Sequence, residues 1–457
     1  MIQRLHGVVW GPALLALLLA VGVIYTLRSR GFPLFGINIW WRETIGSLFR
    51  EEVETKKHKR KYVTKGQAAC TALAATIGTG NIVGVATALT AGGPGAIFWM
   101  WVSGVIGMAT AYGETWLGIK YRYKNRQGKW VCGPAVYLDK GLHMPFLGIL
   151  YGILCLLASL GMGSMVQSNA IAQTMRFSAG VSSLLCAVVV TTVTCGVAAG
   201  GILRIGKVAE KLIPWAAGTY IVFSCITLGA CYEQIPEALS DIFRYAFFPK
   251  SMLGGIGGYG IGQALRYGIA RGVFSNEAGL GSLAGLHGAT EDTTPEEQGM
   301  WAMFEVFFDT IVICTLTALV ILCVTGKSGS VLGENGDGAV LTAGCFRAVL
   351  GNLGEYLVSG AMTVFAFATM IAWFFLGKQT LETVLEQISR WLPLTMGVRK
   401  IIEWGYLVLY GYAVFLGCVS NLESVWALSD IWNGMMAFPN ICALLLLQKQ
   451  VRYPWDK

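Results

Sequence analysis

The chain has 457 residues, of which 54% are hydrophobic and only 13% are charged. Soluble domains carry about 25% charged residues, so this composition excludes an ordinary water-soluble protein. The net charge of +8 comes from short basic clusters between long apolar runs and not from a basic soluble module, which argues against nucleic-acid binding. Together these features predict an all-α polytopic membrane protein.

Apolar runs of about 17–25 residues recur along the chain, and each is long enough to cross a bilayer as a helix. The eleven predicted spans cover residues 8–27, 67–90, 95–119, 146–173, 181–201, 208–231, 256–288, 299–325, 355–377, 401–420 and 425–448. The first is preceded by Arg4 and followed by no small-residue cleavage motif, so we expect a retained helix and not a signal peptide. The polar stretch 38–66 predicts a loop with a short amphipathic helix near Ile39–Phe49.

The distribution of basic residues predicts how the chain is oriented in the membrane. With the N-terminus outside and the spans alternating, 26 of the 34 Lys and Arg residues lie in segments on the inner side. Because cytoplasmic loops are enriched in Lys and Arg, this arrangement is favoured over its inverse. We therefore expect a multi-pass membrane protein with an external N-terminus and a cytoplasmic tail at 449–457.

Two of the apolar runs contain glycine-rich stretches that disfavour a continuous helix, Ala74–Gly84 (AATIGTGNIVG) and Arg271–Gly281 (RGVFSNEAGLG). Each glycine costs a helix about 1 kcal/mol relative to Ala, and both stretches also carry polar side chains at mid-depth. Unwound backbone inside a bilayer is tolerated where it is buried or lines a cavity, and there its carbonyls bind cations and its amides bind anions. The alternative is close helix packing, because Gly80 and Gly84 form a common small-residue packing pair.

The two interrupted runs occupy corresponding positions in two halves of the chain. Each is the first of five runs, in 67–231 and in 256–448, while 1–66 supplies an extra N-terminal helix and a basic loop. Paired interrupted helices in two halves are typical of secondary transporters. The register therefore predicts a five-plus-five inverted repeat, with a binding site where the two breaks meet.

Several longer motifs resemble one family of membrane transporters. They are GTGNI at 78–82, GGPGAIFW at 92–99, QSN at 167–169, RIGKVAEK at 204–211 and FSNEAGLGS at 274–282. On these motifs, the chain resembles the alanine-or-glycine:cation symporter family from about residue 66 to 448. The resemblance implies a leucine-transporter-type fold and the import of small neutral amino acids, chiefly alanine and glycine, coupled to sodium or sometimes to protons.

The resemblance also implies how individual residues would hold a substrate. The backbone amides of Thr79 and Gly80 would bind its carboxylate, as amides at helix N-termini do. Phe274 and Trp373 would wall a small cavity, although an ordinary packing indole is an alternative for Trp373. One methyl group is worth only about 1–3 kcal/mol of apolar contact, so such a cavity would select glycine and alanine chiefly by excluding larger side chains. The other implied substrate-binding residues are Asn81, Gln167, Ser275 and Asn276.

A sodium site is implied in the same way. Ala74 and Ile77 would offer carbonyl oxygens and Thr369 a hydroxyl, which are the ligands that hard cations prefer. Where related sequences have two adjacent hydroxyl residues, this chain has Ala368–Thr369, which removes one possible ligand. Beyond this coupling ion no cofactor is expected, and the twelve cysteines, which lack metal-binding spacing, are expected to be free packing thiols.

Charged residues inside apolar runs are rare and mark functional sites by default. Glu277 is our first candidate for a proton carrier, and the alternative is that it caps unwound amides or pairs with Arg271. We expect Glu114 to lie near the inner end of its span and either to extend toward the membrane surface or to pair with Lys120. The charged residues concerned are Glu114, Arg271, Glu277, Glu305 and Asp309.

These features favour a secondary active symporter that works by alternating access. An enzyme is disfavoured because the sequence shows neither a catalytic constellation nor a phosphate-binding loop. Two alternatives stay open: a proton-coupled transporter of another small solute, and a transport-inactive amino-acid sensor.

Overall fold

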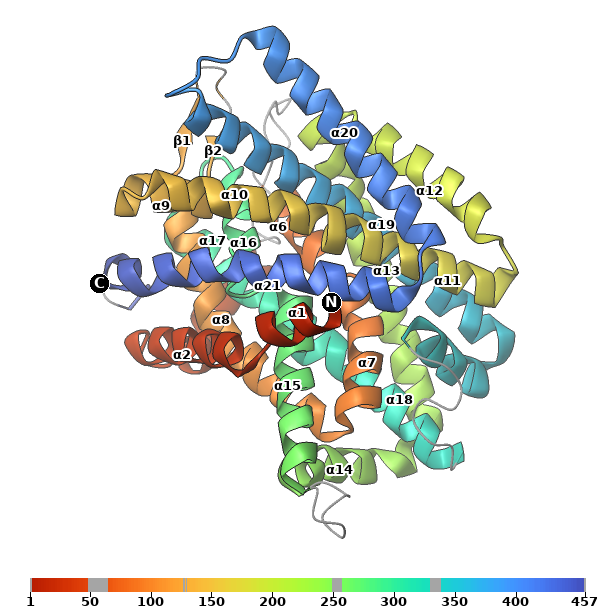
Figure 1. Ribbon diagram of the computed structural model, residues 1–457. Coiled ribbons are helices and arrows are strands. Elements are labelled where there is room, and N and C mark those ends of the chain that lie inside the picture. The colour runs from red at the N-terminus through yellow and green to blue at the C-terminus, as the bar shows by residue number, and fades with distance from the viewer. Residues whose placement is uncertain are drawn as a thin grey trace.

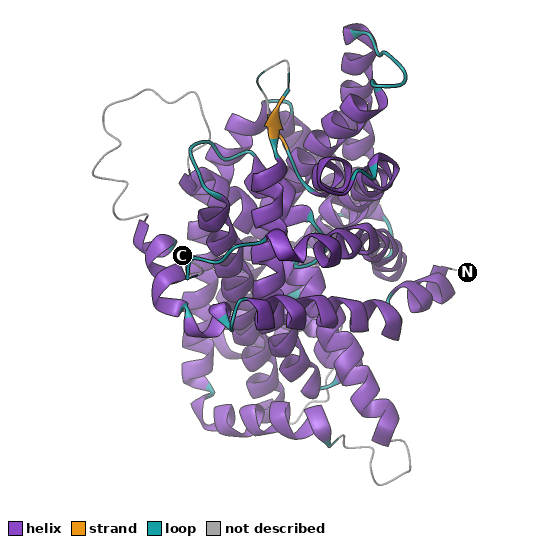
Figure 2. Ribbon diagram, turned by 90° about the vertical axis from the view of Figure 1, so that its left-hand side faces the viewer, coloured by secondary structure: helices purple, strands orange, loops and turns teal. Residues whose placement is uncertain are grey.

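The structure is a computed structural model, and it describes residues 2–47, 65–125, 128, 130–248, 257–328 and 338–455. This part of the chain is almost entirely helical, as Figure 1 shows along the chain and Figure 2 by type of element. Its one sheet is a pair of two-residue antiparallel strands, β1 (Tyr123–Lys124) and β2 (Trp130–Val131), drawn in orange in Figure 2. The prediction of an all-α protein is confirmed.

Short helices surround the first span at the N-terminal end. The elements are α1 (Ile2–Val9), α2 (Pro12–Arg28), α3 (Phe32–Phe35) and α4 (Ile37–Glu43). Pro12 starts α2 because the first turn of a helix needs no amide donor. The expected amphipathic helix near Ile39–Phe49 corresponds in part to α4, while Phe49 and most of the basic cluster lie outside the described residues.

The first group of core helices follows from residue 65. Its elements are α6 (Lys65–Thr76), η2 (Thr79–Asn81), α7 (Val83–Gly92), α8 (Gly95–Tyr121), α9 (Pro134–Leu142), α10 (Pro145–Leu160), η3 (Gly161–Val166), α11 (Gln167–Ala179), α12 (Ser183–Ala198) and α13 (Gly201–Ala230). Here η2 is a 3₁₀ turn, and η3 is a π-helical segment that joins α10 to α11.

The second group runs to the C-terminal end. Its elements are η4 (Tyr232–Gln234), α14 (Ile235–Phe247), α15 (Gly257–Asn276), α16 (Ser282–Gly288), α17 (Pro295–Val306), η6 (Phe307–Cys314), α18 (Thr315–Ser328), α19 (Ala339–Ile388), α20 (Met396–Val419), α21 (Leu422–Leu447) and η7 (Gln448–Gln450). The segment η6 is again π-helical, and it joins α17 to α18. The N-terminal end of α17 shows why the helix begins there: Thr294 Oγ1 accepts a hydrogen bond from the Glu297 amide, and the Glu297 carboxylate accepts one from the Thr294 amide.

Eight helices among the described residues are long and apolar enough to cross a membrane, and the bent pair α6–α7 brings the number to nine. The other two of the eleven predicted spans are α12, which has only 16 residues, and the interrupted pair α15–α16. The prediction of a span at 355–377 was too short, because α19 runs from Ala339 to Ile388 and is divided by a kink at Gly351. Good helix formers such as Gln, Leu and Glu continue α19 well beyond its apolar part.

Two helices that lie between spans escape the search for apolar runs. Both are too short to cross a bilayer, because α9 has 9 residues and α14 has 13. The first is fastened to the end of α19 by an ion pair of 2.7 Å between Asp139 and Arg390. The hydrogen bond to Asp139 raises the pKa of the Arg390 guanidinium above its ordinary value.

The interrupted helices lie inside the bundle. Helix α8 packs against α15, α16 and α17, and the long α19 packs against α10, α11 and α13. Between these layers, α6 packs on α13 and α19, and α7 packs on α15. Helices α10 and α21 run side by side across the front of Figure 1. All twelve cysteines are free, as expected.

Candidate substrate and ion site

The first break separates α6 from α7 and bends the span by 49°. Helix α6 ends at Thr76, and α7 begins at Val83. Between them, the Gly78 amide donates to Asn81 Oδ1 at 3.0 Å, so a side chain replaces the missing helical acceptor. The α-helix is therefore interrupted at residues 77–82, within the glycine-rich stretch Ala74–Gly84, as predicted.

The second break separates α15 from α16. Its backbone is left-handed at Glu277 (φ 59°), Gly279 (φ 89°) and Gly281 (φ 89°), which glycine adopts without strain and glutamate does not. Asn276 Oδ1 accepts a hydrogen bond from the Ala278 amide at 3.0 Å. The interruption lies at residues 277–281, within the predicted stretch.

The first break touches the last turn of α15, directly before the second break. A Cβ atom on Gly80 would lie 2.8 Å from Ser275 Cα, so only glycine lets the two backbones approach this closely. Asp309, on η6, joins them on one side: its carboxylate accepts hydrogen bonds from Asn81 Nδ2 (2.6 Å) and from Ser275 Oγ (2.9 Å). Thr310 Oγ1 donates to the same carboxylate at 3.0 Å, and all these side chains are buried.

The residues of the predicted sodium site lie together. Thr369 Oγ1, on α19, is 2.8 Å from the Ala74 carbonyl oxygen and 3.4 Å from the Ile77 carbonyl oxygen. Gly78 lies against the same hydroxyl, because a Cβ atom there would be 2.6 Å from Thr369 Oγ1. Two carbonyls and one hydroxyl thus converge, and this set of neutral oxygens suits a hard monovalent cation.

The predicted carboxylate site at the first break is only partly free. The Thr79 amide donates to Gln167 Oε1 at 3.2 Å, and Gln167 Nε2 donates to the Met162 carbonyl oxygen at 3.1 Å. In this conformation the Thr79 amide is not free, because a side-chain carbonyl oxygen accepts its hydrogen bond. The Thr79 hydroxyl itself has no hydrogen-bond partner among the described residues.

The two predicted aromatic walls have different partners near the start of the second break. The Phe274 ring stacks on Trp426 of α21, with ring centroids 4.8 Å apart. Trp373, on α19, donates its indole N–H to Glu277 Oε1 at 2.9 Å, and both side chains are completely buried. Asn276 is used internally, because its Nδ2 donates to Thr310 Oγ1 at 3.0 Å. Trp373 is thus more than a packing indole.

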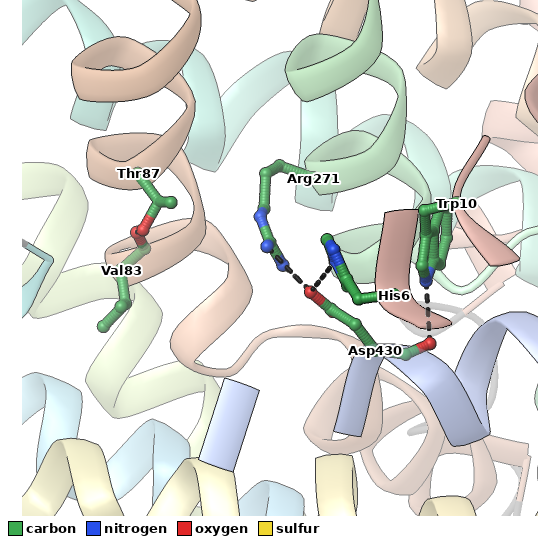
Figure 3. A network of polar contacts seen from close by, with 6 residues as sticks. All are labelled: His6, Trp10, Val83, Thr87, Arg271 and Asp430. Carbon is green, nitrogen blue, oxygen red and sulfur yellow. Dashed lines mark hydrogen bonds and ion pairs between the residues drawn. The ribbon is translucent and has the colours of Figure 1, made fainter. Parts of the chain in front are cut away.

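Arg271 does not pair with Glu277, as the sequence suggested it could. Its guanidinium forms two hydrogen bonds with Asp430 of α21, at 2.8 and 3.1 Å, and lies over the Trp426 ring. Figure 3 shows that α1 joins this cluster through His6, whose Nε2 is 3.1 Å from Asp430 Oδ2. The Trp10 indole donates to the Asp430 carbonyl oxygen at 2.7 Å.

Glu114 is neither near the solvent nor paired with Lys120. It is completely buried, and its Oε2 accepts hydrogen bonds from the amides of Gly279 (3.1 Å) and Gly281 (3.2 Å). Lys120 donates instead to Gln450 Oε1. The sequence analysis missed that Glu114 caps the second break. The signal in the sequence was a charged residue in an otherwise apolar span, and only the structure shows that Gly279 and Gly281 lie beside it.

This geometry defines a class of protein. Two interrupted membrane helices that meet at a buried site of carbonyls, amides and hydroxyls are the arrangement of secondary transporters. The structure of MhsT in complex with L-phenylalanine superposes with a TM-score of 0.53 at 14% identity, over 86% of this chain and 99% of that chain. The chain thus has a leucine-transporter-type fold, and its apolar helices make it a multi-pass membrane protein.

Sequence comparison gives the family. The chain belongs to the sodium:alanine symporter family, whose model matches residues 1–455. The sodium/alanine symporter AgcS of Methanococcus maripaludis is 37% identical over 451 residues, which cover 98% of this chain and 94% of AgcS. An uncharacterized transporter of Haemophilus influenzae is 36% identical over 455 residues, which cover 98% of this chain and 94% of that protein. The resemblance inferred from the motifs is confirmed.

Proposed function

We propose that this protein imports small neutral amino acids, chiefly alanine and glycine, together with sodium ions by alternating access. The observation that supports this most is the contact between the two breaks at Gly80 and Ser275. A free amino acid carries both charges, and at this contact the polar groups of the first break lie beside the Asp309 carboxylate, which accepts hydrogen bonds from Asn81 and Ser275. The position inside the bundle lets one site face either side of the membrane in turn.

We place the sodium ion between Ala74, Ile77 and Thr369. Its ligands belong to two elements, α6 with its unwound end and α19, so a bound ion would hold these elements together. The carbonyl oxygens of an unwound segment carry partial negative charge, and a bound cation compensates it. Sodium would thus favour the conformation in which the substrate site is complete.

We place the substrate carboxylate at the backbone of Thr79 and Gly80, beside Asn81. Gln167 Oε1 already accepts a hydrogen bond from the Thr79 amide, at the position of one carboxylate oxygen. A charged carboxylate is the stronger acceptor, so it would displace this neutral side chain. Phe274, with Ser275 and Asn276 behind it, and Trp373 would then close a space small enough for a methyl group.

The orientation follows from the positive-inside rule. We propose that the N-terminus is external and the C-terminus cytoplasmic, in the cell membrane, and that the two repeats are 67–231 and 256–448. Reaction of a single introduced cysteine in the tail 449–457 with a membrane-impermeant reagent would contradict this orientation if it occurred from outside intact cells.

Uptake into proteoliposomes tests the function. Labelled alanine and glycine should accumulate under an inward sodium gradient and should not accumulate under a pH gradient alone. Uptake driven by the pH gradient alone would show a proton-coupled transporter. Binding without uptake under either gradient would show a sensor.

A further inference from the structure

The buried acidic side chains of the described residues divide into two sets. Four have a basic partner within 3.3 Å: Asp139 with Arg390, Glu305 with His287, Glu355 with Arg347 and Asp430 with Arg271. Three have none: Glu114, Glu277 and Asp309. All three lie at the second break or in contact with it, so the centre of the protein carries more negative than positive groups.

These three carboxylates differ in how many donors they have. Glu114 Oε2 accepts two backbone amides and the Asn440 side-chain amide. Asp309 accepts hydrogen bonds from the side chains of Asn81, Ser275 and Thr310. Glu277 Oε1 accepts one hydrogen bond, from the Trp373 indole. Glu277 Oε2 has no hydrogen bond of normal geometry among the described residues. The Ser282 hydroxyl interacts with the same carboxyl group. Glu277 is the least compensated of the three.

The positive groups that could compensate Glu277 are engaged elsewhere. Arg271, six residues earlier on α15, forms its two hydrogen bonds with Asp430. His287, on the other side of the break, lies between Glu305 and Gln298. A fully buried carboxylate without a positively charged partner costs several kcal/mol, so its persistence points to a positive group that arrives with a ligand.

The position of Glu277 places it beside the substrate site proposed above. It follows Ser275, which touches Gly80, by two residues. Trp373, which holds its Oε1, is one helical turn beyond Thr369, which contacts the Ala74 and Ile77 carbonyls. Glu277 is thus close in the chain to the residue that touches the first break, and its indole partner lies on the helix that carries Thr369.

We propose that Glu277 binds the α-ammonium group of the transported amino acid through Oε2. This inference rests on the proposed function and assigns the second end of the substrate. The ammonium group would supply the positive charge that the buried carboxylate lacks, while the first break binds the carboxylate of the same molecule. The hydroxyl of a 2-hydroxy acid can donate a hydrogen bond but carries no charge, so it would leave the buried carboxylate uncompensated, and 2-hydroxy acids are excluded as cargo.

The test compares L-alanine with L-lactate, which replaces the ammonium by a hydroxyl. Binding of each to the purified full-length protein is measured in saturating sodium, for the wild type, Glu277→Gln and Glu277→Asp. The matched control is Glu296→Gln. Glu296, in the first turn of α17, also accepts a hydrogen bond from an indole N–H, that of Trp116 near the end of α8, at 3.2 Å, but it lies outside both breaks.

We expect Glu277→Gln to weaken alanine binding about 100-fold and to leave the weak lactate binding unchanged. Glu277→Asp should lose less, and the control should behave as the wild type. Sodium binding without amino acid should persist in Glu277→Gln, and thermal stability without ligand should not fall, because an uncompensated charge has been removed.

Three results would overturn the inference. Unchanged discrimination between alanine and lactate in Glu277→Gln would show that the ammonium binds elsewhere. Loss of sodium binding without substrate would make Glu277 an ion ligand, and normal alanine binding with altered pH dependence of uptake would make it a proton carrier. A wild-type protein that binds no neutral amino acid would instead refute the proposed function.

Discussion

The two interrupted helices differ in how their unwound amides are satisfied. At the first break neutral carboxamides accept them, Asn81 from Gly78 and Gln167 from Thr79. At the second break a buried carboxylate, Glu114, accepts two amides at once. A substrate carboxylate can displace a neutral carboxamide, but it would repel a fixed carboxylate. The two breaks are therefore chemically different. The first break is the one that can accept the anionic end of a ligand.

The largest expected effect comes from removing the fixed carboxylate. Glu114→Ala leaves the amides of Gly279 and Gly281 and the Asn440 side chain without their acceptor, and each buried unsatisfied group costs about 1–3 kcal/mol. We expect transport to be abolished and the inactivation temperature in detergent to fall. Glu114→Gln keeps one acceptor oxygen and should retain part of the stability. A stable, fully active Glu114→Ala protein would contradict the capping role.

The contact between the breaks gives the next largest effect. Gly80→Ala places a methyl group 2.8 Å from Ser275 Cα and forces the two backbones apart. We expect alanine uptake to fall at least about 100-fold while membrane insertion is unaffected, because an active-site shift of about 1 Å has effects of this size. The control is Gly84→Ala, four residues along the same segment, where the new methyl group meets no atom within 4 Å. Equal uptake in the two variants would show that the breaks need not touch.

A smaller effect is expected at Thr369, in the sodium site proposed above. Thr369→Val keeps the shape of the side chain but removes the hydroxyl, and loss of one neutral ligand should weaken apparent sodium affinity about 10-fold. Thr369→Ser should restore it. Thr363, whose hydroxyl donates to the Ser359 carbonyl oxygen on the same helix, is the matched position, and Thr363→Val should leave the sodium dependence of uptake unchanged. A normal sodium dependence in Thr369→Val would move the ion elsewhere.

The smallest effect is a gain. Ala368 is completely buried beside Thr369, and Ala368→Ser adds the hydroxyl that this chain lacks. We expect apparent sodium affinity to tighten about 2- to 5-fold, the value of roughly one weak hydrogen-bonding ligand. Sodium titrations of uptake measure it, and an unchanged midpoint would show that this side chain does not reach the ion.

The local features of the fold were predictable from sequence because their causes are local. Clustered glycines with polar neighbours predicted both breaks, and apolar runs predicted the spans. The resemblance suggested Ala74, Ile77 and Thr369 as sodium ligands, and the structure brings the oxygen atoms of these three residues together. The length of α19 was not predicted, because polar helix formers extend it beyond the apolar run that marks a span.

The charges were not predictable, because their partners are distant in the chain. Glu114 precedes the amides it accepts by 165 and 167 residues, and Arg271 precedes Asp430 by 159. Neighbouring residues suggested Lys120 for Glu114, and Arg271 for Glu277, and both suggestions were wrong. Only the packing of α8 and α21 against the second break decides which charge meets which.

The N-terminal span, α2 with the preceding Trp10, is joined to the last span, α21, by hydrogen bonds at two separate points. The Trp10 indole donates to the Asp430 carbonyl oxygen at 2.7 Å, and the Tyr25 hydroxyl donates to the Leu444 carbonyl oxygen at 2.9 Å. These two spans should therefore be displaced as one rigid unit during the transport cycle. Leu17 and Val23 point outward from α2, so spin labels attached there would track that displacement by pulsed electron resonance without perturbing any ligand.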